Sequence, residues 1–120
     1  MSEAQRFTGG CHCGQVRYEA ELDLSTPVVS CNCSMCGRVG SLLTFVTAEK
    51  FRLLAGEDQL TNYQFNKKVI DHPFCRTCGI KSFARGVRPD GKTMVAVNTR
   101  CLDDVDIGQL KVTYFDGKSL

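Results

Sequence analysis

Seven of the eight cysteines fall into three tight clusters, and these clusters constrain the chain more than any other feature of its 120 residues. The clusters are Cys11-x-Cys13, Cys31-x-Cys33-x-x-Cys36 and Cys75-x-x-Cys78. Thiolates at such spacing are typical zinc ligands. A closed structural zinc site takes four ligands, whereas a site with three protein ligands keeps one coordination position open for chemistry. Seven clustered cysteines therefore predict one site of four ligands and one of three.

The composition places the chain among ordinary globular proteins, with 42% hydrophobic residues, 23% charged residues and a formal net charge of +2. The length suits one domain, so we expect residues 1–120 to form a single domain. Nucleic-acid-binding proteins usually carry a basic stripe, whereas the lysines and arginines here are scattered. We therefore expect no nucleic acid partner.

The first ten residues and the apolar runs predict a cytoplasmic protein. Residues 1–10 include Glu3 and Arg6 and lack the apolar core of a secretory signal. No apolar run approaches the ~20 residues needed to cross a bilayer, so no membrane partner is expected. In the cytoplasm thiols stay reduced, and cysteine clusters more often serve metal binding or catalysis than disulfides. Cys-x-Cys pairs also seldom reach disulfide geometry without strain.

Short apolar stretches separated by turn residues predict an all-β or mostly β fold. Apolar and polar residues alternate from Val16 to Leu22, as in a half-buried strand. Pro89-Asp90-Gly91 predicts a turn that joins Ile80–Val87 to Thr93–Asn98 as a hairpin. Further strands are expected within residues 27–29, 42–46, 51–53, 60–65, 71–75 and 110–115, with Asp116-Gly117 closing the last. A helix over residues 47–54, capped by its first threonine, is the alternative for that stretch.

The outer two clusters suit one closed zinc site. Cys75 and Cys78 can form a turn that points both sulfurs at one ion, and Gly79 supplies the permissive backbone that such a turn favours. This pair needs two more ligands, and Cys11 with Cys13 is the most economical choice. Metal binding of this kind contributes directly to folding, by roughly 10–16 kcal/mol apparent in zinc-finger peptides.

The middle cluster offers three thiolates, Cys31, Cys33 and Cys36, from six consecutive residues. Because the loop is so short, one side of a bound metal would face outward. Three thiolates leave a zinc site with a net charge of −1, so bound water would be acidified less than at a site with neutral ligands. A coordinating thiol, in contrast, is deprotonated outright. The cluster therefore favours thiol chemistry over hydrolysis.

A second structural site is the alternative for this cluster, with Cys101 or a histidine as its fourth ligand. An isolated cysteine such as Cys101 is more often a small buried apolar residue. His12 lies between two expected ligands, so its ring should point away from their metal. His72 could serve a site or carry a proton, although a plain hydrogen-bonded histidine is the default. A zinc deaminase is disfavoured, because no His-x-Glu accompanies His72-Pro73-Phe74-Cys75 and its Pro-Cys spacing is wrong.

Together the three motifs resemble the glutathione-dependent formaldehyde-activating enzyme family (GFA), which includes the centromere protein V (CENP-V) domain. The matching segments run in order from about residue 8 to residue 98. They are Gly9-Gly10-Cys11-His12-Cys13-Gly14-Gln15-Val16-Arg17-Tyr18, Cys31-Asn32-Cys33-Ser34-Met35-Cys36 and Cys75-Arg76-Thr77-Cys78-Gly79.

The resemblance implies a β-tent fold, in which small antiparallel sheets are organised around zinc. It implies two zinc ions per chain, with weaker retention expected at the second. The structural zinc would lie at Cys11, Cys13, Cys75 and Cys78. The catalytic zinc would lie at Cys31, Cys33 and Cys36.

The namesake reaction of the family condenses glutathione with formaldehyde to S-(hydroxymethyl)glutathione, which is a carbon–sulfur lyase reaction run backwards. The resemblance thus implies a small thiol of the glutathione kind and a small carbonyl as substrates. This chain is shorter than the namesake enzymes, and no glutathione-binding position can be matched residue by residue. Candidate partners for the carboxylates of glutathione are Arg38, Arg52, Lys81 and Arg85.

Two functions follow from these observations. In the first, the open zinc holds a thiol as its thiolate, which adds to a small carbonyl; orientation and thiolate generation supply the catalysis. In the second, the chain is a non-enzymatic, zinc-stabilised module that binds a protein or another ligand. The sequence does not define the oligomeric state.

Overall fold

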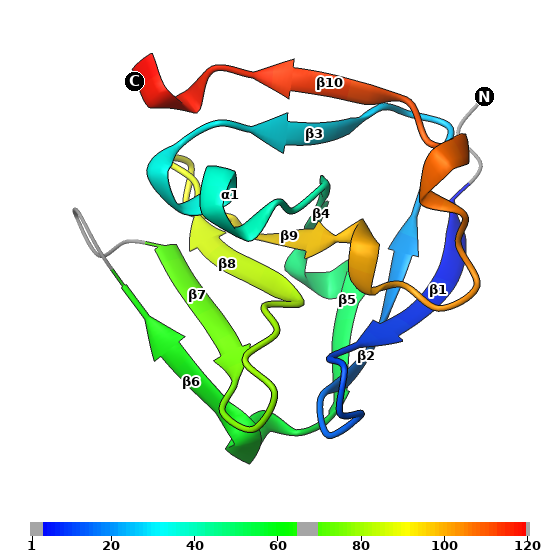
Figure 1. Ribbon diagram of the computed structural model, residues 1–120, viewed down its shortest axis with the longest axis vertical. Helices are drawn as coiled ribbons and strands as arrows, with labels where there is room; N and C mark the ends of the chain where they lie inside the picture. Colours follow the sequence, from blue (N-terminus) through cyan, green and yellow to red (C-terminus); the bar gives the residue numbers. More distant parts are fainter. Residues whose placement is uncertain (1–3, 65–69, 120) are drawn as a thin grey trace.

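Two β-sheets make up most of the computed structural model, which describes residues 4–64 and 70–119 (Figure 1). The smaller sheet has the strand order β1-β2-β5, and the larger has the order β10-β3-β4-β9-β8-β7-β6. The smaller sheet consists of β1 (Gln5–Gly10), β2 (Arg17–Leu22) and β5 (Phe51–Ala55). The larger consists of β3 (Val28–Cys31), β4 (Leu43–Thr47), β6 (Leu60–Tyr63), β7 (Ile70–Cys75), β8 (Phe83–Val87), β9 (Thr93–Asn98) and β10 (Val112–Phe115).

The prediction of a mostly β fold is confirmed, and the two sheets diverge from each other like the sides of a tent (Figure 1). Strand pairs among the described residues are antiparallel, except that β10 runs parallel to β3. One short α-helix, α1 (Ser34–Val39), follows β3. Single 3-10 turns occupy Ala48–Lys50, Glu57–Gln59, Thr99–Cys101, Ile107–Gln109 and Gly117–Ser119.

The core lies between the two sheets and is built around three aromatic rings. Tyr18 of β2 stacks on Phe51 of β5 with ring centroids 5.1 Å apart. Phe51 in turn meets Phe83 of β8 at 4.7 Å, so the aromatic cluster joins the smaller sheet to the larger. Such pairs contribute about 0.5–1.5 kcal/mol each beyond the burial of their area. Val95 and Val97 of β9 are buried in the same cluster.

The predicted hairpin is present, because β8 pairs with β9 from Phe83↔Val97 to Val87↔Thr93. Gly91 has a φ of +87° in the connecting turn, which is the left-handed conformation that glycine tolerates. β8 begins at Phe83 rather than at Ile80, because the preceding residues complete the turn that follows Cys75. The strand predicted over residues 60–65 is observed as β6, and Phe65 lies outside the described residues.

The alternative of a helix over residues 47–54 is wrong. A single 3-10 turn, Ala48–Lys50, is followed at once by the strand β5. Phe51 is buried between Tyr18 and Phe83. Its place in the strand β5 positions its ring there. Tertiary packing therefore overrides the local helix signal at Thr47.

Sequence patterns did not indicate β1 or α1. β1 contains few apolar residues, and its glycines are needed because the chain passes close by: a Cβ on Gly9 would lie 2.6 Å from the Cys101 carbonyl oxygen. α1 has six residues and is capped at its N-terminus by Cys33, whose sulfur accepts the N–H of Cys36. Gly40, with a φ of +73°, caps its C-terminus. Among the described residues, no helix has the length and apolar character to cross a membrane.

Candidate metal centres

The first centre joins the two sheets. Cys11 and Cys13 lie in the β1–β2 loop, and Cys75 and Cys78 lie in the turn at the end of β7. All four Sγ atoms lie within 4.8 Å of one another. The Sγ of Cys13 is 3.6 Å from the Sγ of both Cys11 and Cys75. Four sulfurs at 2.3 Å from a zinc ion form a tetrahedron with edges of about 3.8 Å, so this arrangement suits zinc.

Two similar turns shape this four-sulfur cluster. In each, a glycine directly follows the second cysteine and adopts a left-handed backbone, Gly14 at φ +83° and Gly79 at φ +79°. The Gly79 N–H donates to the Cys75 carbonyl at 2.8 Å and the Gly14 N–H to the Cys11 carbonyl at 3.3 Å. Cys75 is fully buried and Cys11 nearly so. Cys78 is half-buried and Cys13 is exposed, so the cluster extends from the interior to the surface at this end of the molecule.

The thiols of this cluster differ in their affinity for protons. Burial alone would raise the pKa of Cys78, but the backbone N–H groups of Cys13 and Ile80 lower that pKa to about 6. For Cys13, the Gln15 N–H would lower the pKa, but burial and the other three thiols raise it to about 12. A metal ion that binds here must displace protons, so its affinity depends on pH.

The second centre lies at the opposite end of the larger sheet, where β3 leads into α1. Cys31 is the last residue of β3, Cys33 caps α1 and Cys36 lies within it, and their Sγ atoms lie within 4.8 Å of one another. The Cys36 N–H donates to the Cys33 sulfur at 3.3 Å, and the Cys33 N–H to the Cys31 sulfur at 3.5 Å. The three side chains are half-buried. This three-sulfur cluster is thus preformed by backbone groups and open on one side.

The C-terminal segment supports the three-sulfur cluster. The amide of Asn32 donates to Asp116 at 3.0 Å and accepts the N–H of Lys118 at 2.9 Å. A Cβ on Gly117 would lie 2.6 Å from the Cys31 sulfur, so only glycine leaves room for that sulfur. We call residues 116–119 the C-terminal clasp. Sequence reasoning treated Asp116-Gly117 only as the end of a strand.

Lys81 is a cation whose pKa is influenced by the three-sulfur cluster. Burial lowers the pKa of Lys81, whereas the thiolates of Cys36 and Cys33 raise it. Burial also raises the pKa of Cys36 to about 12, with a further contribution from Cys33. The pKa of Cys33 is lowered despite burial, because the Cys36 N–H stabilises its thiolate. The half-buried Lys81 ammonium group is therefore coupled electrostatically to Cys33 and Cys36.

The other predicted candidates have different surroundings. His72 is buried on β7, where burial and then Lys81 lower its pKa. Together with Lys81 it lines a hollow of about 230 Å³ that Met35 and Val39 of α1 also border. His12 is exposed. Within the described residues, neither histidine groups with the three sulfurs as a further ligand, and Cys101 does not either.

The remaining candidate cations are engaged elsewhere. Arg38 donates to the Ser34 carbonyl at 2.9 Å within α1. Arg52 belongs to β5 in the smaller sheet. Arg85 lies over the ring of Phe83, 5.4 Å from its centroid. Of the four cations predicted to bind carboxylates, Lys81 is the half-buried one, whereas the three arginines are exposed, including Arg38 on α1 itself.

A β-tent with one closed and one open cysteine cluster defines a class of metal-binding protein rather than a single activity. The chain belongs to the glutathione-dependent formaldehyde-activating enzyme family, which it matches over residues 6–115. It is also similar to a Rhodobacter sphaeroides protein whose crystal structure was determined by structural genomics. The two are 34% identical with a TM-score of 0.76, and the match covers 88% of this chain and 99% of that one.

Proposed function

We propose that this protein is a zinc-dependent enzyme of the carbon–sulfur lyase type, which adds a small thiol of the glutathione kind to formaldehyde or another small carbonyl. The observation that carries the proposal is a half-buried cluster of three sulfurs beside a complete cluster of four. Four sulfurs satisfy a zinc ion, and three leave a coordination position for substrate. Membership of the family supports the same chemistry.

In this proposal Cys11, Cys13, Cys75 and Cys78 hold a structural zinc, and Cys31, Cys33 and Cys36 hold the second ion. The second zinc, when bound, provides a position at which a thiol loses its proton. The thiol sulfur then forms a bond to the carbonyl carbon. The proton released from the thiol ends on the carbonyl oxygen, so atoms and electrons balance without an oxidant or reductant.

Lys81 is proposed to orient the thiol. Glutathione carries two carboxylates, and a half-buried ammonium group is a favourable partner for one of them because little water competes. The hollow that Lys81 lines reaches α1 through Met35 and Val39, and α1 carries Cys36. A thiol whose carboxylate lies on Lys81 would therefore have its sulfur near the three-sulfur cluster.

Hemithioacetal formation from glutathione and formaldehyde tests this function directly. The rate should fall to the uncatalysed value in Cys33→Ala, while the circular dichroism spectrum and one zinc ion per chain are retained. Equal rates from the two folded proteins would overturn the proposal. The alternative, a non-enzymatic binding module, predicts instead that Cys33→Ala damages folding as much as a substitution in the four-sulfur cluster.

A further inference from the structure

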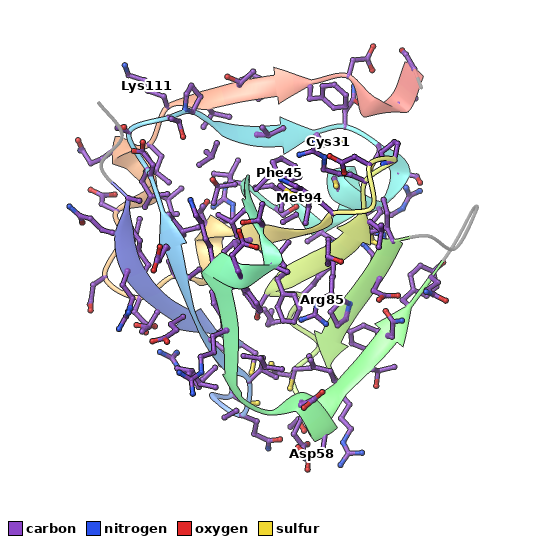
Figure 2. All side chains as sticks on the ribbon, turned by 180° about the vertical axis from the view of Figure 1, so that it is seen from behind. Cys31, Phe45, Asp58, Arg85, Met94 and Lys111 are labelled. Atoms are coloured by element: carbon purple, nitrogen blue, oxygen red, sulfur yellow. The ribbon has the colours of Figure 1, made fainter. Side chains whose placement is uncertain are left out.

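An apolar cavity of about 400 Å³ lies on the larger sheet, on the face opposite the core. Cross-strand partners share one face of a sheet. Phe45 of β4, Ala96 of β9 and Ala84 of β8 form one such row, and Met94 with Gly86 forms the next. All five line the cavity, and Figure 2 shows Phe45 and Met94 among the side chains of these strands.

Small residues produce this cavity. Ala84, Gly86 and Ala96 cover little of the sheet, while Phe45 and Met94 extend from the same surface. Phe45 is 52% exposed, which is unusual for a phenylalanine in the middle of a sheet strand. The volume of the cavity falls at the lower end of the ~300–1,000 Å³ range of small-molecule sites, which are mostly apolar. The shape and chemistry therefore suit an apolar group of modest size.

The cavity adjoins the three-sulfur cluster. Cys36 packs against the buried group formed by Leu43, Ala84 and Ala96. Two of these residues, Ala84 and Ala96, also line the cavity. A molecule that reacts at the cluster thus has an apolar surface within reach, on the side of the sheet against which Cys36 packs.

The two charged residues that border the cavity have partners of their own. Arg85 and Arg88 border it, but Arg85 lies over the ring of Phe83 and Arg88 pairs with Asp90 at 2.8 Å. Lys81, which is coupled electrostatically to Cys33 and Cys36, lines the other hollow. The two hollows are therefore lined by different residues, Lys81 and His72 in one and Phe45 and Met94 in the other.

We propose that the carbonyl substrate is an aldehyde with an uncharged apolar chain, and that this chain lies in the cavity between Phe45 and Met94. The inference rests on the proposed addition of a thiol to a carbonyl, and it names the carbonyl class. Formaldehyde would leave the cavity empty, whereas each methylene added to the aldehyde buries more apolar surface. Catalytic efficiency should then rise roughly three- to fourfold per methylene until the cavity is filled.

The test compares formaldehyde, propanal and hexanal at fixed glutathione, with the zinc-loaded protein. We expect kcat/KM to rise along the series for the wild type. Gly86→Leu, which fills the cavity, should abolish that rise while formaldehyde still reacts. Ala55→Leu, at an exposed position on the smaller sheet, is the matched control and should keep the rise.

Binding of hexan-1-ol, an unreactive analogue, gives a second measurement on the wild type that does not depend on how Gly86→Leu folds. Saturable changes in the amide chemical shifts of Phe45, Met94 and Ala96 would support the proposal. The absence of such changes at these residues would overturn it.

Aldehyde kinetics separate this inference from the proposed function. If formaldehyde is turned over but kcat/KM does not rise along the aldehyde series, this inference alone is overturned. No turnover with any aldehyde would overturn the proposed function as well. A dimer that hexan-1-ol dissociates would assign the cavity to a second copy and overturn the proposal.

Discussion

The two cysteine clusters use similar chemistry but join very different parts of the chain. The four-sulfur cluster links the β1–β2 loop of one sheet to the end of β7 in the other. The three-sulfur cluster draws all its sulfurs from residues 31–36. A metal that links distant residues closes a long loop and restricts the unfolded chain, whereas a metal within six residues orders only its own loop. The separation of the ligands in sequence therefore decides whether a metal stabilises the fold or serves a site.

Substitution of Cys75 by serine should have the largest effect. Cys75 is fully buried and belongs to the cluster that joins the sheets. Structural zinc contributes roughly 10–16 kcal/mol in zinc-finger peptides, so the loss of the zinc proposed here would exceed most of the ~5–15 kcal/mol by which a protein is stable. We expect Cys75→Ser to show no cooperative thermal unfolding by circular dichroism.

Cys33→Ser is the matched control, because it removes one sulfur from the three-sulfur cluster. It should lose one zinc ion by elemental analysis and still unfold cooperatively, within a few degrees of the wild type. If both variants unfolded alike, the proposed division of roles between the clusters would be wrong.

Chelator should remove the two metals in separate steps. The three-sulfur cluster has one ligand fewer and is half-buried, so its zinc should be released first and without loss of the fold. A colorimetric zinc assay, followed together with circular dichroism, would record one zinc ion released before any unfolding. Cys36→Ser should show only the later step, and a single step in the wild type would contradict the comparison.

A smaller effect is expected from Gly117→Ala in the C-terminal clasp. The added methyl group would meet the Cys31 sulfur and displace it or the clasp. Changes beside metal ligands commonly cost about 10- to 100-fold in metal affinity, so we expect zinc binding at the three-sulfur cluster to weaken about tenfold. Competition with a zinc indicator measures this affinity. Gly108→Ala, in another exposed 3-10 turn, should bind zinc like the wild type.

An effect confined to one substrate, with no change in the fold or in zinc content, is expected from Lys81→Gln. Loss of a charge-assisted contact to a carboxylate should raise KM for glutathione about tenfold. KM for 2-mercaptoethanol, which has no carboxylate, should stay unchanged. Arg52→Gln, in the other sheet, should leave both values as they are. An equal rise for both thiols would mean that Lys81 acts on the cysteine cluster and does not bind the substrate.

The two cysteine pairs and the triplet were predictable because their spacing is local, whereas the joining of the two pairs followed from the four ligands that a closed zinc site needs. A Cys-x-x-Cys turn followed by glycine determines where its two sulfurs point, and Gly79 marks such a turn in the sequence itself. Alternation of apolar and polar residues likewise predicted β2, and the turn at Pro89-Asp90-Gly91 predicted the hairpin of β8 and β9. Each of these signals depends on residues close together in the chain.

The features that escaped prediction depend on residues far apart. The clasp brings Asp116 to Asn32 across 84 positions, and no local pattern records that contact. The apolar cavity needs one face of three adjacent strands, including Phe45 and Gly86, whose register appears only in the folded sheet. β1 was not predicted because it lacks a pattern of buried apolar side chains. Its Gly9 instead allows the backbone at Cys101 to pass close by.

The segment between Cys78 and Lys81 connects the two centres through only two intervening residues. Two hydrogen bonds hold its C-terminal half: the Cys75 N–H donates to the Ile80 carbonyl at 3.1 Å, and the Asn98 amide donates to the Lys81 carbonyl at 3.2 Å. Filling of the four-sulfur centre thus fixes the backbone from which Lys81 extends. Assembly would then be hierarchical: the first zinc builds the substrate side of the second, and a chain with only that zinc would be folded but inactive.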